Sequence, residues 1–316
     1  MSRPSAPPPS DRVADPLVHE ALLYDGVVGF LDGTMKFIYE GFSLNEPTIV
    51  AAPPGNLTLL RERLGAFAES VEFLDMTEAG RNPGRIIPWV LCKFIDQHAG
   101  HRVRIVGQPI WPERTTEEYP GCVQHEAMIN VALAGREATV LCPYDLAHLD
   151  QRRIGDAHRT HPVMVDDNGG RYASDTYDPY GVAEEYNVPL SEPPAGATTL
   201  RFELESLVEV RRRVAEVGLD ADLVPDRIVD LQSAVNELAT NSVQHGGGSG
   251  TLRTWHDDER VVCEVRDFGH VTNPVTGRLR PPDGRGRGLV MVHFLADLVQ
   301  RHTSTTGTAT RIHVLR

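Results

Sequence analysis

The stretch from Val224 to Leu289 constrains the fold more than any other part of this 316-residue chain. It opens with apolar residues at helical spacing, which predicts a helix with one buried face. These residues are Ile228, Leu231, Val235 and Leu238. Pro225 suits the first turn of a helix, and three consecutive glycines from Gly246 end the pattern.

The polar face of this predicted helix bears three side chains four residues apart, so they project together. They are Glu237, Asn241 and His245. After the glycines, the apolar run 261–266 predicts a strand that ends in Asp267-Phe268-Gly269. Residues 284–289 then read Gly-Arg-Gly-Arg-Gly-Leu and lead into another helical pattern.

This order of segments indicates nucleotide binding. The side-chain oxygen of Asn241 can coordinate Mg²⁺, a hard cation that takes few protein ligands. Asp267 is an acceptor at a strand end and can receive an exocyclic amine such as that of adenine. Backbone amides of a glycine-rich loop can approach phosphates at a helix N-terminus. Glu237, one turn from the metal ligand, can accept a proton from an attacking hydroxyl. Taken singly, each segment also fits a plain turn, a loop or a solvent-facing side chain.

Together these segments resemble the boxes of the GHKL ATPase superfamily. The Asn-Glu-Leu-Ala-Thr-Asn run at 236–241, with His245, is similar to its asparagine box. Asp267 to Gly269 resembles the first glycine box and 284–289 the second, while Gly307-Thr308 resembles the last element, ahead of a strand at 309–315. The resemblance implies an α+β two-layer sandwich for the C-terminal part of the chain.

The resemblance also implies roles for individual residues. ATP and Mg²⁺ are the expected cofactors, with Asn241 as the Mg²⁺ ligand, Asp267 as the adenine acceptor and Glu237 as the general base. The other residues implied to contact the nucleotide are His245, Gly269, Gly284, Gly286, Arg287, Gly288, Leu289 and Thr308. A structural role at the helix end is the alternative for His245, and a solvent-facing role is the alternative for Arg287.

Ahead of this region, short apolar strands alternate with helical patterns. Strands are expected at 47–52, 71–75, 103–106, 138–142 and 162–165, and helices at 26–39, 57–67, 85–98 and 124–134. Repeated units of this kind predict an α/β domain with a parallel sheet covered on both faces. Residues 53–56, Pro-Pro-Gly-Asn, follow the first strand where a phosphate loop would lie. They lack Gly-Lys-Ser/Thr, so we expect a degenerate P-loop-like fold without ATP.

Residues 17–165 resemble the MEDS sensory domain of bacterial signalling proteins. The resemblance rests on His19 with Tyr24, Gly107-Gln108-Pro109, residues 125–130 and residues 141–145. It implies a small organic ligand. His19, Glu126 and Asp145 are candidates to line its pocket, and the alternative for all three is a buried polar group that orients a loop.

The chain is expected to divide into a disordered tail, the MEDS-like domain, a linker and the ATP-binding domain, at 1–16, 17–165, 166–197 and 198–316. The net charge is −13 and lies almost entirely in the first 197 residues, which argues against direct nucleic-acid binding. No apolar run is long enough to span a membrane. The four cysteines show no paired spacing, so neither zinc nor a disulfide framework is expected. These features predict a cytoplasmic protein.

The Asn-Glu-Leu-Ala-Thr-Asn signature resembles the anti-sigma-factor serine kinase group within the superfamily. The implied partners are a sigma factor and an anti-anti-sigma (STAS-type) protein, and a homodimer is the implied assembly. Two alternatives stay open: a non-catalytic, ATP-dependent switch that sequesters a sigma factor, and an atypical histidine kinase acting on a separate protein. Residues 166–226 contain no histidine that could serve as a phosphoacceptor ahead of the ATP domain.

Overall fold

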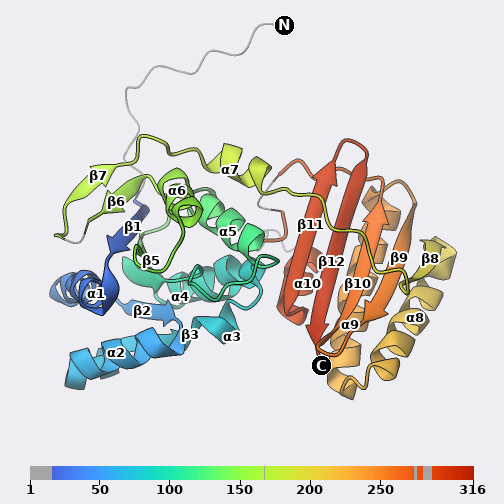
Figure 1. The fold of residues 1–316 in the computed structure, drawn as a ribbon, viewed down its shortest axis with the longest axis horizontal. Helices are drawn as coiled ribbons and strands as arrows, with labels where there is room; N and C mark the ends of the chain where they lie inside the picture. Colours follow the sequence, from blue (N-terminus) through green and yellow to red (C-terminus); the bar gives the residue numbers. More distant parts are fainter. Residues whose placement is uncertain (1–15, 167, 274–275, 280–286) are drawn as a thin grey trace, which may run out of the picture.

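The computed structural model describes residues 16–166, 168–273, 276–279 and 287–316. These residues form two sheets, one mostly parallel and one antiparallel, each packed against helices (Figure 1). The parallel-rich first sheet and the antiparallel second sheet agree with the predicted fold classes. None of the helices among the described residues combines the length and apolar character needed to cross a bilayer.

The first sheet has the strand order β3-β2-β4-β5-β1-β6-β7. Its strands are β1 Val18–Tyr24, β2 Thr48–Ala52, β3 Val71–Asp75, β4 Val103–Gly107, β5 Ala138–Asp145, β6 Val163–Val165 and β7 Arg171–Ala173. Neighbouring strands are parallel except for the β6–β7 pair. The five predicted strands are confirmed. Sequence reasoning did not find β1, which lies between β5 and β6, because two polar residues, His19 and Glu20, interrupt its apolar pattern.

Helices cover both faces of this sheet, as predicted for parallel strands. They are α1 Gly26–Leu44, α2 Pro54–Leu64, α3 Met76–Ala79, α4 Cys92–Gln97, α5 Tyr119–Ala132 and α6 Gln151–Thr160, with the 3₁₀ turn η1 Gly65–Ser70. Successive strand residues belong to two separate hydrophobic cores, one on each face of the sheet. Leu22 packs with α1 and α2, whereas Ala21 packs with α4 and α5. Because α2 starts at Pro54, Gly55 and Asn56 belong to its first turn. The P-loop-like relation stays a prediction.

The helix predicted at 85–98 is not continuous. A 3₁₀ turn, η2 Pro83–Arg85, leads into a π-helical segment, η3 Ile86–Leu91, before α4 begins at Cys92. Pro88 lies inside this segment and has no N–H to donate, so a regular α-helical ladder is interrupted there.

The second sheet has the order β11-β12-β10-β9-β8, with every neighbouring pair antiparallel. Its strands are β8 Thr198–Glu203, β9 Ser249–His256, β10 Arg260–Asp267, β11 Leu298–Ser304 and β12 Gly307–Leu315. The helices α8 Leu207–Asp220, α9 Pro225–His245 and α10 Gly288–Leu295 pack on one face and share a single apolar core with it, and the 3₁₀ turn η4 Leu204–Ser206 precedes α8. This is the expected two-layer arrangement.

The segment expected to be a linker is structured over much of its length. Besides β7 it contains the helix α7 Pro179–Glu185. The end of α7 is bound to α5, because the Gln124 side chain donates to the Tyr186 carbonyl over 3.1 Å. The chain then crosses the sheet face opposite the helices (Figure 1). There Arg311 donates to the Ser191 carbonyl and to the carboxylate of Glu264, whose side chain is fully buried.

Candidate functional site

Helix α9 positions one wall of the candidate site. Its predicted apolar residues Ile228, Leu231, Val235 and Leu238 are all buried against the second sheet, which leaves the opposite face free to carry polar groups. Pro225 occupies the first turn, and the helix ends before Gly246, whose N–H donates to the Ser242 carbonyl. Asn241, half-buried, and His245, exposed, both line the cavity described below.

Asp267 is fixed at the end of β10 by two hydrogen bonds. Its Oδ2 accepts from the Ser242 hydroxyl over 2.6 Å, and its Oδ1 accepts from the Gly269 backbone N–H over 2.8 Å. Thr308 donates to the Gly269 carbonyl over 2.7 Å and so holds the same turn from β12. The turn after β10 is therefore tied to both α9 and β12.

The end of α9 and the turn after β10 approach each other too closely for side chains. A Cβ atom at Gly246 would lie 2.6 Å from Asp267 Cγ, and one at Gly269 would lie 3.0 Å from the Gly246 Cα. Phe268 N–H donates to the Gly246 carbonyl over 3.0 Å in the same place. The close packing therefore requires glycine at positions 246 and 269, and it places Asp267 next to the C-terminal end of α9.

A cavity of about 300 Å³ lies beside this junction. Its lining joins α9, the end of β10, the start of α10 and the strands β11 and β12: Leu238, Asn241, Ser242, His245, Gly246, Val265, Asp267, Gly269, His270, Val271, Thr276, Gly288, Leu289, Arg301, Thr308 and Thr310. The walls are mainly apolar, with Asp267 as a charged acceptor, which is the composition typical of small-molecule pockets. Burial lowers the pKa of Arg301 to about 10, so its guanidinium stays cationic at neutral pH.

The cavity gathers Asn241, His245, Asp267, Gly269, Gly288, Leu289 and Thr308 of the predicted residues. Gly284 and Gly286 lie outside the described residues. Arg287 is exposed and is not part of the lining. Glu237 does not line the cavity either. Its carboxylate instead lies against Gly288 at the start of α10, where a Cβ atom would overlap Oε2.

Sequence reasoning missed several lining residues, among them Ser242, His270, Arg301 and Thr310. Ser242 follows Asn241 directly and is fully buried, so its hydroxyl needs a partner in the interior. Its position, four residues after Leu238 on the buried face of α9, could have predicted its burial but not its partner. Arg301 and Thr310 belong to strands whose exposed and buried faces could not be assigned before the sheet was known.

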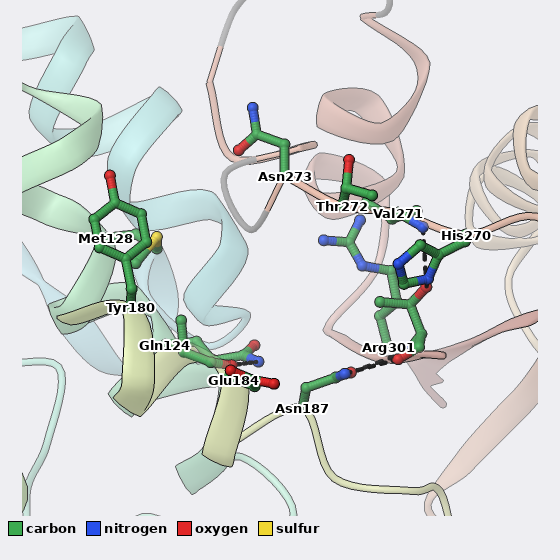
Figure 2. A pocket seen from close by; sticks show the side chains of 12 residues that line it. Gln124, Met128, Tyr180, Glu184, Asn187, His270, Val271, Thr272, Asn273 and Arg301 are labelled. Carbon is green, nitrogen blue, oxygen red and sulfur yellow. Dashed lines mark hydrogen bonds between the residues drawn. The ribbon is translucent and has the colours of Figure 1, made fainter. Parts of the chain in front are cut away.

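A second cavity of about 430 Å³ adjoins the first and lies between the two domains (Figure 2). Gln124, Met128, Tyr180, Glu184 and Asn187 contribute from α5, α7 and the segment after α7. His270, Val271 and Arg301 line both cavities. Asn187 bridges the gap, because its Nδ2 donates to the Thr303 carbonyl over 2.7 Å and its Oδ1 accepts from the Thr303 N–H over 2.9 Å.

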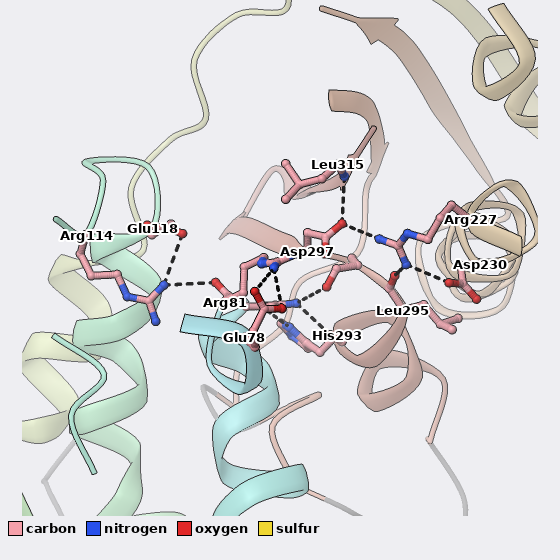
Figure 3. A network of polar contacts seen from close by, with 12 residues as sticks. Glu78, Arg81, Arg114, Glu118, Arg227, Asp230, His293, Leu295, Asp297 and Leu315 are labelled. Carbon is pink, nitrogen blue, oxygen red and sulfur yellow. Dashed lines mark hydrogen bonds and ion pairs between the residues drawn. The ribbon is translucent and has the colours of Figure 1, made fainter. Parts of the chain in front are cut away.

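The domains also meet along α10 through a partly buried polar network (Figure 3). Asn82, fully buried, donates to the carbonyl of His293 over 2.9 Å. Asp297 is shared between Arg81 of the first domain, at 3.1 Å, and Arg227 of α9. Burial, together with the charge of Arg278, lowers the pKa of His293 well below its usual value and keeps the imidazole neutral.

Comparisons with known proteins match two separate parts of the chain. Residues 18–162 match the family described as "MEDS: MEthanogen/methylotroph, DcmR Sensory domain", and residues 200–314 match the "Histidine kinase-like ATPase domain". A comparison with the curated proteins found no match.

Two solved structures show a distant likeness. The RsbU and RsbW domains of Rv1364c from Mycobacterium tuberculosis are 18% identical over 39% of this chain and 33% of that chain, with a TM-score of 0.31. The Acinetobacter baumannii histidine kinase AdeS is 12% identical over 43% of this chain and 72% of that chain, with a TM-score of 0.24. The chain thus spans about one third of the first structure, and neither likeness is close enough to carry over an activity or a partner.

Proposed function

Because this chain joins a MEDS sensory domain to a histidine kinase-like ATPase domain, we propose that it is a signalling regulator that binds ATP with Mg²⁺ beside Asp267. The carrying observation is the Asp267 carboxylate, which Ser242 and Gly269 hold at the edge of a mainly apolar cavity. Each carboxylate oxygen has further acceptor capacity, so Asp267 can receive the adenine amino group while the purine lies against apolar walls. The residues present therefore fit the nucleotide.

The proposed reaction is phosphoryl transfer to a protein serine. Asn241 would hold the Mg²⁺ ion, which neutralises phosphate charge. In the transfer the serine oxygen bonds to the γ-phosphorus, the bond from that phosphorus to the bridging oxygen of ADP breaks, and the hydroxyl proton passes to Glu237. The carboxylate of Glu237 lies at the N-terminal end of α10, next to Gly288. This position favours a role near the phosphates and away from the adenine.

The proposed partners are a sigma factor and an anti-anti-sigma (STAS-type) protein that supplies the serine, and the proposed location is the cytoplasm. Support comes from the sequence of α9, Asn-Glu-Leu-Ala-Thr-Asn at 236–241. A homodimer and a small organic ligand of the first domain are part of the same proposal.

A non-catalytic switch is the second candidate, and one observation favours it. Glu237 stands outside the lining of the cavity and contacts α10 instead. In this candidate ATP binding alone would set the affinity for a sigma factor, and Glu237 would only position α10.

We further propose that the first domain controls the ATP site through α10. The start of this helix lines the cavity at Gly288 and Leu289. Near its other end, Asn82 donates to the His293 carbonyl, and the Phe294 ring packs on the Trp89 ring with centroids 4.6 Å apart. Asn82→Ala removes the buried hydrogen bond to His293 and should change ATP affinity. Unchanged affinity in a folded Asn82→Ala protein would contradict control by this route.

Transfer of label from γ-labelled ATP to a candidate STAS-type protein tests the function. Acid-stable, alkali-labile label that disappears in Glu237→Gln, while ATP affinity is kept, supports the serine kinase. ATP-dependent sigma-factor binding without any transfer supports the switch. Acid-labile label on a partner protein would favour the histidine kinase alternative. Asn241→Ala is the companion variant and should lose Mg²⁺-dependent ATP binding as well as transfer.

A further inference from the structure

Four side chains with metal-binding atoms meet inside the first domain, and none of them lines the two cavities described above. They are His19 on β1, Cys142 on the neighbouring strand β5, Glu126 on α5 and His161 directly after α6. All four residues are buried, and one ligand atom of each lies within 4.8 Å of the other three.

Four of the six separations between these atoms match the edges of a tetrahedral metal site, and the other two are at most 4.8 Å. His19 Nε2 and His161 Nε2 lie 3.3 and 3.2 Å from Glu126 Oε2. Cys142 Sγ lies 3.4 Å from the same oxygen and 3.5 Å from His19 Nε2. With zinc bonds of about 2.1 Å to nitrogen or oxygen and about 2.3 Å to sulfur, tetrahedral ligand atoms stand about 3.3–3.6 Å apart.

The hydrogen bonds of His161 leave two acceptors facing each other. Its Nδ1 lies 2.9 Å from the Ala157 carbonyl, so in the neutral ring this nitrogen carries the proton. Nε2 then carries a lone pair and no proton, and it lies 3.2 Å from Glu126 Oε2, which is also an acceptor. Among the described residues, neither His161 Nε2 nor Glu126 Oε1 has a hydrogen-bond partner. Such a juxtaposition in a dry interior costs free energy unless a cation lies between the two groups.

The outer ring nitrogens are arranged as in metal-bound histidines, which hydrogen-bond through the nitrogen that does not face the ion. His161 uses Nδ1 to contact the Ala157 carbonyl. His19 Nδ1 lies 3.0 Å from the side-chain amide of Asn130. The same Nδ2 also lies 3.3 Å from the Thr160 carbonyl. Rotation of the amide would exchange this longer contact for an oxygen facing His19 Nδ1, which supports the tautomer of His19 that offers Nε2 to a metal.

The geometry points to a buried Zn²⁺-type centre formed by His19, Glu126, Cys142 and His161. One thiolate, one carboxylate and two neutral imidazoles cancel the charge of a divalent ion, so the complete site is neutral in the core. Thiolate and imidazole ligands favour a borderline-soft ion over Mg²⁺ or Ca²⁺. Four protein ligands close the coordination shell, which makes the site structural. It would join β1, β5, α5 and the chain entering β6.

Cobalt substitution of the full-length protein tests the centre directly. The wild type, expressed with Zn²⁺ or with Co²⁺, should contain metal in equimolar amount. The cobalt form should show the intense visible bands of tetrahedral Co²⁺ and a thiolate-to-cobalt charge-transfer band. Cys142→Ser should lose the charge-transfer band. Cys122→Ser is the matched control, because Cys122 is an equally buried free thiol of the same core and lies outside the cluster.

Circular dichroism and ATP binding confirm that each variant is folded, and Glu126→Gln provides a second variant of nearly unchanged volume. A strong chelator should lower the melting temperature of the wild type and of Cys122→Ser, with little effect on Cys142→Ser. Folded wild type that takes up neither ion would overturn the proposal and leave a buried imidazolium–carboxylate pair only. Identical cobalt spectra for Cys142→Ser and Cys122→Ser would overturn it as well.

Discussion

Replacing Asp267 by asparagine should weaken ATP binding much more than it weakens the fold. The Gly269 N–H needs an acceptor, so the asparagine oxygen will stay with it and the NH₂ group will face Ser242 and the cavity. An adenine amino group would then meet a donor. Loss of one hydrogen bond to a charged acceptor is worth about 1.5–3 kcal/mol, so ATP affinity should fall about 10- to 100-fold. Isothermal calorimetry with ATP measures this loss.

Asp257→Asn is the matched control. Asp257 lies just before β10, whereas Asp267 is the last residue of that strand. Its Oδ1 accepts the backbone N–H of Glu259 over 2.9 Å, again two residues ahead. Both variants should lower the free energy of unfolding by about 1 kcal/mol or less, and only Asp267→Asn should lose ATP. GTP, which carries a carbonyl in place of the amine, should discriminate less between wild type and Asp267→Asn. Equal ATP affinities for the two variants would refute the role of Asp267.

Three further changes probe the site, the interface and the fold. Gly288→Ala should displace the flexible end of Glu237 and slow phosphoryl transfer at saturating ATP by about 10²-fold, with the melting temperature nearly unchanged. An unaltered rate in a steady-state transfer assay would contradict this. Trp89→Leu and Phe294→Leu should show a coupling of about 0.5–1.5 kcal/mol in a double-mutant cycle of urea unfolding, whereas additive effects would mean that the domains do not dock in solution. Burial, with the charge of Arg260, lowers the pKa of His313 to about 4, below the usual value near 6.5. The unfolded chain therefore takes the proton first, and stability present above pH 6.5 is lost as the pH falls toward 4. His313→Gln should make this slope shallower by up to about 1.4 kcal/mol per pH unit in unfolding titrations, and an unchanged slope would contradict the assignment.

Much of the candidate site could be predicted because its parts are local in sequence. The helical spacing of Asn241 and His245 and the position of Asp267 at a strand end are readable without knowing the fold. The strand β9, which lies between α9 and β10 in the sequence, was missed although its buried residues alternate, because a glycine and several polar residues hid the period. Ser242, which fixes Asp267, carries no motif of its own. Its role arises only when α9 and β10 pack together.

The cluster in the first domain shows the opposite situation. His19 and Glu126 were candidates from the sequence, and the structure brings them together, but Asp145 lies elsewhere and pairs with His148 at 2.8 Å. The cysteine spacing gave no reason to expect zinc. Metal motifs are recognised when two ligands share one turn or helix, whereas Glu126 and Cys142 come from separate elements that a parallel sheet and its covering helix juxtapose.

The domain interface depends on contacts that no local pattern encodes. Asn82 and His293 are 211 residues apart, and Gly84 leaves room for the His293 ring that no other residue type would leave. These contacts fall on α10, an eight-residue helix that is about 12 Å long. A short regular helix moves as one body, so its two ends cannot shift independently. Gly288, which lines the cavity and contacts Glu237, and Phe294, which packs against Trp89 of the first domain, therefore lie on one rigid element, and this supports the proposed control through α10.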